Sequence, residues 1–226
     1  MKLVSPQYNI SLTFEENKAV LLIIEEKRLR LELVDALYQQ CMGEDSGFVL
    51  SEGAQILKMS KAADMLMNPF SVDCNNRKIL TKLYQEIETC GNEDFYEEKE
   101  KINREIIVFF DKIMMNVSYD IATKLELDLV ELCKLYQVRL ENAGNTLVEK
   151  IIEYIKIMSQ LCAVKLFILL NFTLYLNKEE IKAMCEFASY RKVHILFVEY
   201  IVPVDIEIKN GCIIDEDGCI IELGNG

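Results

Sequence analysis

Alternating acidic residues near position 128 are the side chains in this sequence best suited to hold a metal ion. Glu126, Asp128 and Glu131 belong to the segment LELDLVE over 125–131. If this segment starts extended and then turns into a helix, Glu126 and Asp128 share one side and Glu131 joins them. Converging carboxylates suit a hard cation such as Ca²⁺ or Mg²⁺. Asp128 and Glu131 also have the spacing of a helix capping box, so a capped, solvated helix start is the alternative interpretation.

Basic residues are the second set that could do chemistry, by contacting phosphate. The net charge of −12 argues against a protein that coats nucleic acid with its whole surface. This net charge still allows a local basic surface, because nucleic-acid binding depends on the charge of the surface that contacts the nucleic acid. Each cation taken alone fits solvated surface, and together they would matter only if assembly gathered them. The candidates are Arg77, Lys78, Lys82, Lys134, Arg139, Lys150 and Lys156, with Lys58 and Lys61 before them.

Signatures of known catalytic machinery are missing from the sequence. It contains no phosphate-loop, dinucleotide, zinc-protease or serine-hydrolase motif. The one histidine, His194, lies in the apolar run 193–198, which favours a core or edge-strand position over a catalytic one. The eight cysteines form no C-x-x-C pair, which favours unlinked thiols in a reducing compartment over zinc or disulfides.

The elements that must position these residues are organised around 17–41. Ala19–Ile24 is an unbroken apolar run and predicts a strand buried on both faces of a parallel sheet. Leu29, Leu33, Leu37 and Cys41 then recur every four residues, as on one face of a helix. A nucleotide-binding fold would place its phosphate loop between them. Here the turn is EEKR over 25–28, which has no glycine and two carboxylates.

The rest of the chain predicts an α/β protein with an inserted helical domain. Strand patterns occupy both ends of the chain, at 2–14, 48–50, 164–170 and 193–198, and helix patterns fill the middle. Gly91-Asn92 is expected to end the first of these helices, and capping boxes are expected at Thr146/Glu149 and Asn177/Glu180. Asn210-Gly211 and Asp217-Gly218 predict hairpin turns. We therefore expect an α/β head with a mostly parallel sheet from residues 1–68 and 160–226, and an α-helical leg domain over 69–159.

A membrane or secreted location is not expected. The first sixteen residues lack a basic segment followed by a long apolar one, so they do not resemble a secretory signal. The most apolar stretch, 161–176, is short and contains Lys165 and Asn171. These features predict a cytoplasmic protein.

The order of these patterns resembles a known family, the small subtype-specific CRISPR adaptation proteins of type II-A systems. The resemblance spans about 20–222. It rests on five segments in the same order and spacing, which read AVLLIIEEKRLRLELVDALYQQC, VDCNNRKILTKLYQEIE, ELDLVELCKLYQVRLE, KLFILLNFTLYLNKEEIKAM and VHILFVEY. The family implies a head related to P-loop folds without nucleotide hydrolysis, together with a helical leg domain.

The resemblance also implies a function. Members form homotetrameric rings whose basic hole holds double-stranded DNA by its ends without reading sequence, and calcium supports assembly and DNA binding. They act in the acquisition of new spacers, alongside the integrase pair and the guide-RNA nuclease. Carried over by position, the calcium-binding acids fall on Glu126, Asp128 and Glu131. The basic residues of the hole fall on Lys134, Arg139 and Lys150, with Arg77 and Lys78 as further candidates.

An enzyme on the same scaffold is the alternative. A metal-dependent nucleotide or phosphoester hydrolase would use Asp120, Glu126 and Asp128. The glycine-free turn and the missing motifs favour the first interpretation, a DNA-binding protein without catalysis.

Overall fold

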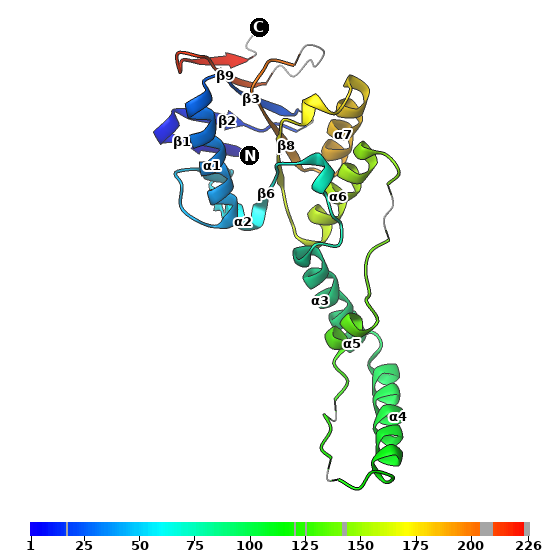
Figure 1. Ribbon diagram of the computed structural model, residues 1–226. Coiled ribbons are helices and arrows are strands. Elements are labelled where there is room, and N and C mark those ends of the chain that lie inside the picture. Colours follow the sequence, from blue (N-terminus) through cyan, green and yellow to red (C-terminus); the bar gives the residue numbers. More distant parts are fainter. Residues whose placement is uncertain (17, 120, 125, 142–143, 204–209, 224–226) are drawn as a thin grey trace. The chain divides into compact units, whose positions relative to one another are not determined.

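The computed structural model describes residues 1–226 apart from 17, 120, 125, 142–143, 204–209 and 224–226. The chain forms two compact units, residues 1–74 with 142–226, which we call the sheet unit, and residues 75–141, which we call the helical unit. The helical unit is shorter than the expected insertion 69–159, because the helix at 147–161 packs within the sheet unit. Both units are drawn in Figure 1.

A six-stranded sheet forms the centre of the sheet unit, in the order β10-β9-β3-β8-β7-β6. Among the described strands, all neighbours run parallel except the hairpin pair β9 and β10. Every residue of β3 is buried, as the apolar run predicted for a strand inside a parallel sheet. The bounds are β3 (Val20–Ile24), β6 (Ala63–Leu66), β7 (Leu166–Leu170), β8 (His194–Glu199), β9 (Gly211–Ile214) and β10 (Ile220–Leu223). The α/β fold class is therefore confirmed, and so is the Asp217-Gly218 turn between β9 and β10.

The segments that the sequence placed before and after the first strand-helix unit form a second, antiparallel sheet. Its order is β2-β1-β4-β5. Leu3 of the central strand β1 pairs with Leu12 on one side and Leu50 on the other, and all three are buried. The bounds are β1 (Lys2–Ser5), β2 (Ile10–Thr13), β4 (Val49–Glu52) and β5 (Gln55–Leu57).

Helices cover both faces of the six-stranded sheet. On one face, Leu33 and Leu37 of α1 (Lys27–Met42) join one apolar core with Leu22, Val198 and the small sheet. Because side chains alternate along a strand, residues such as Phe197 face the opposite side, where α7 (Lys178–Tyr190) packs on β8 and α6 (Leu147–Leu161) packs on α7. Figure 1 shows α1 on one side of the sheet and α6 and α7 on the other. Both predicted capping boxes are present at the starts of α6 and α7.

Four short helical turns lie in the described connections between strands and helices of the sheet unit. They are α2 (Met59–Ala62), η1 (Pro6–Tyr8), η2 (Pro69–Ser71) and η3 (Phe172–Leu174). Of these, η2 follows β6 and η3 follows β7, at the carboxyl ends of these strands.

The helical unit consists of α3 (Arg77–Glu93), α4 (Tyr96–Met114) and α5 (Leu129–Leu135), with α3 packed against both others. The prediction that Gly91-Asn92 ends α3 was wrong, because the helix continues to Glu93. Gly91 instead lies where α3 meets α5, and a side chain there would overlap that of Leu129. Gly91 thus lets the Leu129 side chain approach α3 closely and does not mark the end of the helix.

The two ends of the helical unit are joined by side-chain bonds. Asn75 and Leu140 exchange two hydrogen bonds, from Asn75 Nδ2 to Leu140 O at 3.1 Å and from Leu140 N to Asn75 Oδ1 at 2.8 Å. The hydroxyl of Tyr84 donates to Val138 O at 2.9 Å. Residues 138–140 are therefore held along the first two turns of α3.

Candidate metal centre and nucleic-acid interface

The predicted metal ligands lie at a hollow of about 410 Å³ within the helical unit. It is bounded by the later turns of α3, the start of α4 and the segment leading into α5. Its charged lining combines three carboxylates with two ammonium groups, and the full lining is Glu88, Asn92, Tyr96, Lys99, Lys124, Glu126, Leu127, Asp128 and Leu129. Two of the three predicted ligands, Glu126 and Asp128, are therefore brought together.

Asp128 has two structural partners. Its Oδ1 accepts the backbone N–H of Glu131 at 3.0 Å, which makes Asp128 the N-cap of α5. Its Oδ2 accepts from Lys124 Nζ at 3.2 Å. These bonds, that to Glu131 first and that to Lys124 second, hold the pKa of Asp128 below its ordinary value. The carboxylate is thus ionised and already stabilised by one positive charge.

Glu131 takes a different direction from the other two acids. Its carboxylate pairs with Lys134 Nζ at 2.7 Å, and this pairing raises the pKa of the lysine. Glu131 does not line the hollow, because its position in the first turn of α5 aims it along the helix toward Lys134. Both partners are solvent-exposed, so the ion pair itself contributes little stability.

The donor chemistry of the hollow fits a hard cation in part. Carboxylates of Glu88, Glu126 and Asp128 are oxygen ligands of the kind that calcium takes. Yet among the described residues no three acids, histidines or cysteines stand close enough to hold an ion as they are placed. The ammonium group of Lys124 forms an ion pair with the Asp128 carboxylate, so a metal ion binding to Asp128 would have to displace this ammonium group. Asp120, the further acid of the hydrolase alternative, lies outside the described residues.

Sequence reasoning missed the other charged and polar residues of this hollow, among them Glu88, Asn92, Lys99 and Lys124. Glu88 and Asn92 are four apart on α3 and so share a helix face, which was a usable signal. Lys99 donates to Asn92 Oδ1 at 2.8 Å and bridges the start of α4 to the end of α3. Glu88 and Lys99 fall in a highly charged stretch over residues 86–105, and such a stretch is typical of a solvated helix face rather than of a ligand site.

Three predicted DNA-contacting residues lie near one another at the other end of the helical unit. Arg77 and Lys78 occupy the first turn of α3, and both are exposed. Arg139 stands between Val138 and Leu140, which are bonded to α3 and to Asn75 respectively. The guanidinium of Arg139 is exposed and donates to Gln137 at 3.2 Å. The hydrogen bonds that join the two ends of this unit therefore also hold Arg139 close to Arg77 and Lys78.

The two remaining basic candidates are placed differently. Lys134 stands near the end of α5 and is engaged by Glu131. Lys150 is exposed in the first turn of α6 and belongs to the sheet unit, so the five predicted residues are divided between the units.

In the turn between β3 and α1, a carboxylate side chain binds the N–H groups at the start of the helix. The carboxylate of Glu26 accepts the backbone N–H of Leu29, and also that of Arg28 at 2.9 Å. These two bonds, with Leu29 first, lower the pKa of Glu26. The first N–H groups of a helix are the donors that a phosphate would use. In this chain a side chain of the turn itself satisfies them.

The same turn is fixed from a second side by Arg30. Its guanidinium donates to Ile24 O at 3.1 Å and to Glu25 O at 2.9 Å, and it stands 5.2 Å from the ring centre of Tyr200. The carbonyl groups at the end of β3 are thereby bonded within the protein.

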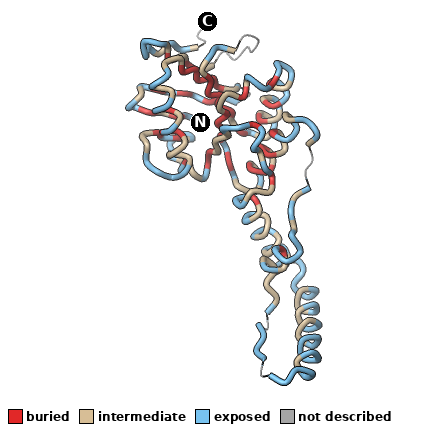
Figure 2. The backbone as a smooth tube through the Cα atoms, viewed as in Figure 1, coloured by how far each residue is buried: buried red, intermediate tan, exposed pale blue. Residues whose placement is uncertain are grey.

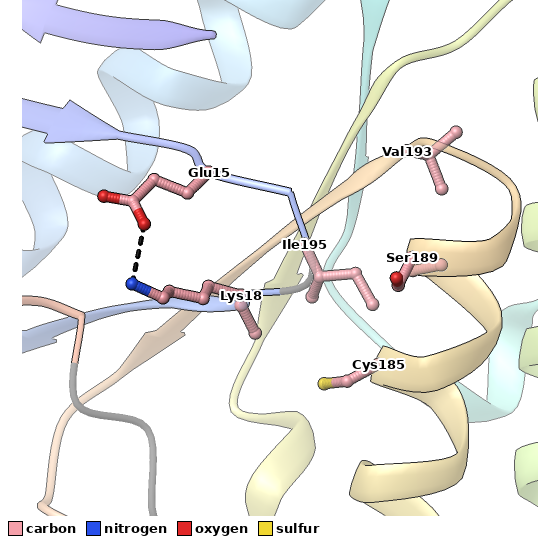
Figure 3. Close-up of a pocket in the computed structure, with 8 residues that line it drawn as sticks. Glu15, Lys18, Cys185, Ser189, Val193 and Ile195 are labelled. Carbon is pink, nitrogen blue, oxygen red and sulfur yellow. Dashed lines mark hydrogen bonds and ion pairs between the residues drawn. The ribbon is translucent and has the colours of Figure 1, made fainter.

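A small hollow between β8 and α7 is too confined to hold a ligand. Its volume is about 10 Å³, which is room for about one water molecule. Figure 3 shows Cys185 and Ser189 of α7 facing Ile195, with the ion pair between Glu15 and Lys18 at 2.6 Å to one side. Burial raises the pKa of the Cys185 thiol to about 11, so this sulfur is not a reactive thiolate.

Six of the eight cysteines and the single histidine are buried or half-buried. All eight cysteines lie among the described residues, and none forms a disulfide. His194 begins β8 and packs against Phe14 with ring centres 5.7 Å apart and ring planes tilted by 49°, and burial lowers its pKa. None of the helices in the described part of the chain combines the length and the apolar character needed to cross a bilayer.

Comparison with known proteins gives a consistent result over most of the chain. A family model described as CRISPR-associated protein (Cas_Csn2) matches residues 40–218. A protein named CRISPR-associated protein Csn2 from Streptococcus agalactiae is 26% identical over 191 residues, which are 81% of this chain and 82% of that protein. Another of the same name, from Enterococcus faecalis, is 24% identical over 201 residues, 82% of this chain and 84% of that protein. The chain therefore belongs to the Csn2 family of type II-A CRISPR-associated proteins, as the order of its motifs predicted.

Proposed function

We propose that this protein acts in CRISPR spacer acquisition by binding the ends of double-stranded DNA without regard to sequence. In this proposal it works as a calcium-supported homotetrameric ring and carries out no catalysis. Membership of the Csn2 family supports the role in adaptation, and the arrangement of the described residues supports the finer statements.

The observation that carries the proposal is the position of Glu26. A degenerate P-loop-like head would present the β3–α1 turn to a nucleotide phosphate. Here the N–H groups of Arg28 and Leu29 already donate to the Glu26 carboxylate. A phosphate would have to displace a bonded anion and would meet negative charge. This argues for a scaffold that binds a partner molecule over one that turns over nucleotide.

Double-stranded DNA fits the exposed cations of the helical unit. Arg77, Lys78 and Arg139 lie near one another, and none belongs to a helix shaped to enter a groove. Phosphate contacts hold a duplex without reading bases, so such residues favour sequence-independent binding. Lys134 and Lys150 would add to this surface in a ring. The overall charge of −12 then limits DNA binding to the surface where the cations gather.

Assembly into a ring is supported by the exposed apolar face of α4. No described residue of this helix is buried, and Figure 2 shows it pale blue and tan throughout. Large apolar side chains left in water on this scale mark an interaction surface. Those on α4 are Tyr96, Ile102, Val108, Phe109, Phe110 and Ile113. We propose that copies of the same chain cover them in the homotetramer.

Calcium would be held at the hollow of the helical unit. Glu126 and Asp128 line it, and Glu131, the third ligand of the carried-over pattern, would have to leave Lys134 and turn toward the hollow. When bound, the ion would supply positive charge that neutralises the acids around it. Asp128 would exchange its bond to Lys124 for one to the ion, and would still accept the N–H of Glu131 through its other oxygen.

The proposed partners follow from the proposed role. They are linear double-stranded DNA, further copies of this chain, the CRISPR integrase pair and the guide-RNA nuclease. Because these meet on intracellular DNA, we propose a cytoplasmic location.

The test uses the purified full chain with labelled linear and closed circular DNA, in calcium or in EDTA. We expect a particle four times the mass of the chain in calcium, retention of linear DNA alone, and no loss of DNA or nucleotide. Affinity should fall steeply as salt rises. A monomer unaffected by calcium would overturn the proposal, and so would steady hydrolysis of DNA or ATP.

A matched pair of variants tests the DNA surface. Arg77→Glu with Arg139→Glu should weaken linear DNA binding at least about tenfold, because two phosphate contacts become repulsive. Lys101→Glu with Arg104→Glu, two exposed residues in α4 of the same unit, is the control with the same change of net charge and should bind within about twofold of the wild type. Equal losses in both proteins would mean that overall charge, not these residues, governs binding.

A further inference from the structure

One edge of the six-stranded sheet carries unusually many exposed apolar side chains. They follow the carboxyl ends of three neighbouring strands, β6, β7 and β8. Each is between 48% and 68% exposed, which is high for side chains of this size, and they are Met67, Phe70, Leu174, Tyr175, Ile201 and Val202. Because parallel strands end at the same edge, these side chains lie on one side of the sheet unit.

A ring contact, a shared hollow and the adjacency of Leu174 and Tyr175 in the chain link five of these six side chains, all except Met67. The rings of Phe70 and Tyr175 meet edge to face at 5.2 Å between centres. Leu174, Ile201 and Val202 line one hollow of about 540 Å³. This volume is in the range of sites that accept a bulky group. We call the six residues the apolar edge.

A buried carboxyl group forms part of the hollow. Glu199 ends β8, is almost fully buried, and accepts the N–H of Thr173 at 3.1 Å. Burial raises its pKa. The lining also includes Thr173, Asn177, Lys178 and Glu179, so polar groups beside the apolar side chains can fix the orientation of a binding partner.

The same edge becomes acidic beyond the apolar part. Next to β8 lies β3, which is followed by Glu25 and Glu26, and next to β3 lies β9, which is followed by Asp215, Glu216 and Asp217. Arg30 at this edge bonds the β3 carbonyls, and Arg28 pairs with Glu32 at 3.5 Å. Lys27 at the start of α1 and Lys178 in the hollow are further cations, against the five acids that follow β3 and β9. From β6 to β9 is four strand spacings, or about 19 Å.

We propose that this edge is a docking surface for a different protein, which presents an apolar segment followed by basic residues. The apolar side chains of that segment would enter the hollow beside β7 and β8, and its cations would meet the acids beyond β3 and β9. A helix of about four turns or six extended residues would cover the distance. This inference rests on the proposed function, because it assigns the surface to one of the adaptation partners.

A second copy of this chain fits the edge less well. Two identical surfaces related by a twofold axis would bring the apolar parts together, but would also bring acidic parts toward one another or toward apolar ones. Like charges at an interface oppose association. Charge complementarity therefore favours a basic partner over self-association.

The experiment measures binding of the purified integrase pair and guide-RNA nuclease from the same CRISPR locus to the immobilised full chain. In Leu174→Ser with Ile201→Ser, we expect the affinity for one of these proteins to fall at least tenfold. Tyr190→Ser is the control, because Tyr190 is 82% exposed at the far end of α7, and its affinity should be unchanged. Equal binding by all three chains would overturn the proposal.

A charge variant tests the acidic half of the edge. Glu216→Lys with Asp217→Lys should lower the same affinity, chiefly through a slower association rate. Asp215 is left in place, because its carboxylate accepts the N–H groups of Asp217 and Cys219 and so holds the turn. An affinity that stays the same or rises would refute the basic partner.

Further readouts separate this inference from the proposed function. Particle mass and linear DNA retention are measured on the same variants and should not change. A fall in mass would show that the edge joins copies of this chain, which overturns the inference. If the wild-type chain binds DNA but none of the adaptation proteins, the docking surface is refuted and the proposed function stands. If it binds a partner but no DNA, only the proposed function is refuted.

Discussion

Gly211 lies directly against the main-chain carbonyl of Leu21, so close that a side chain at position 211 would overlap it. The two residues face each other where β9 joins β3, and the backbone of Gly211 is in a conformation with φ of +143° that favours glycine. Asn210-Gly211 was predicted to be a hairpin turn, but the residues that would precede it lie outside the described residues. Gly211 itself begins a strand, and its role there is close approach to β3.

Replacing this glycine should therefore be costly. We expect Gly211→Ala to destabilise the protein by about 3 kcal/mol, because the new methyl group forces β9 away from a strand that is buried on both faces. Urea denaturation measures the change. Gly218→Ala is the control, since Gly218 has a φ of +78° but open space around it, and backbone strain alone should cost about 1 kcal/mol. Equal losses would mean that conformation, not overlap, explains the choice of glycine at 211.

The carboxylate of Glu26 predicts a particular dependence of stability on pH. Its hydrogen bonds to Leu29 and Arg28 favour the ionised form, so its pKa in the folded protein lies below the ordinary value of 4.5. The resulting stabilisation is complete above that value and is lost as the pH falls through the lowered pKa. Glu26→Gln should be less stable than the wild type at pH 7, and this difference should vanish on acidification. A difference that stays constant with pH would show that charge plays no part.

For Glu199 we expect stability to change with pH in the opposite direction. Burial raises its pKa above the ordinary value of 4.5, so the wild type loses stability as the pH rises through the raised pKa and the buried group ionises. Glu199→Gln keeps an oxygen to accept the N–H of Thr173 and removes the charge. It should match the wild type below pH 4 and be more stable at pH 7, by urea denaturation. Glu179→Gln, an exposed acid at the same edge, should bring no such gain.

Lys124 predicts how calcium affinity responds to a competing charge. Its ammonium stands 3.2 Å from the Asp128 carboxylate, where the proposed ion would bind. Lys124→Gln should raise calcium affinity about fivefold, measured by titration calorimetry, because one unit charge near a surface site is worth about 1 kcal/mol. Lys112→Gln, exposed on α4, is the control and should change little. Weaker binding in Lys124→Gln would place the ion elsewhere.

Sequence patterns predicted the elements whose signals are local. The apolar run at 20–24 is the buried strand β3, and Thr146 with Glu149 is a capping box, because both signals depend only on neighbours in the chain. Gly91 was misinterpreted, since its role depends on Leu129, which is remote in sequence. The pairing of β1 with β4 and the packing of α6 beside α7 are likewise long-range and left no local signal.

The candidate site was predicted in part for the same reason. Glu126 and Asp128 alternate in an extended segment, so their spacing placed them together. Glu88 reaches the same hollow from α3, which only the packing of α3 on α5 could reveal. The two carboxylates at 25–26 were expected to repel an anion. That Glu26 would itself take the place of that anion depended on the direction of one side chain.

The paired hydrogen bonds between Asn75 and Leu140 bear on how such a chain can evolve. They close residues 75–141 into a loop whose two stems stand side by side, so everything beyond the stems can lengthen, shrink or be exchanged without moving the points of attachment. Such a helical unit can be exchanged between related chains, and its length can change while the sheet unit keeps its strand pairing.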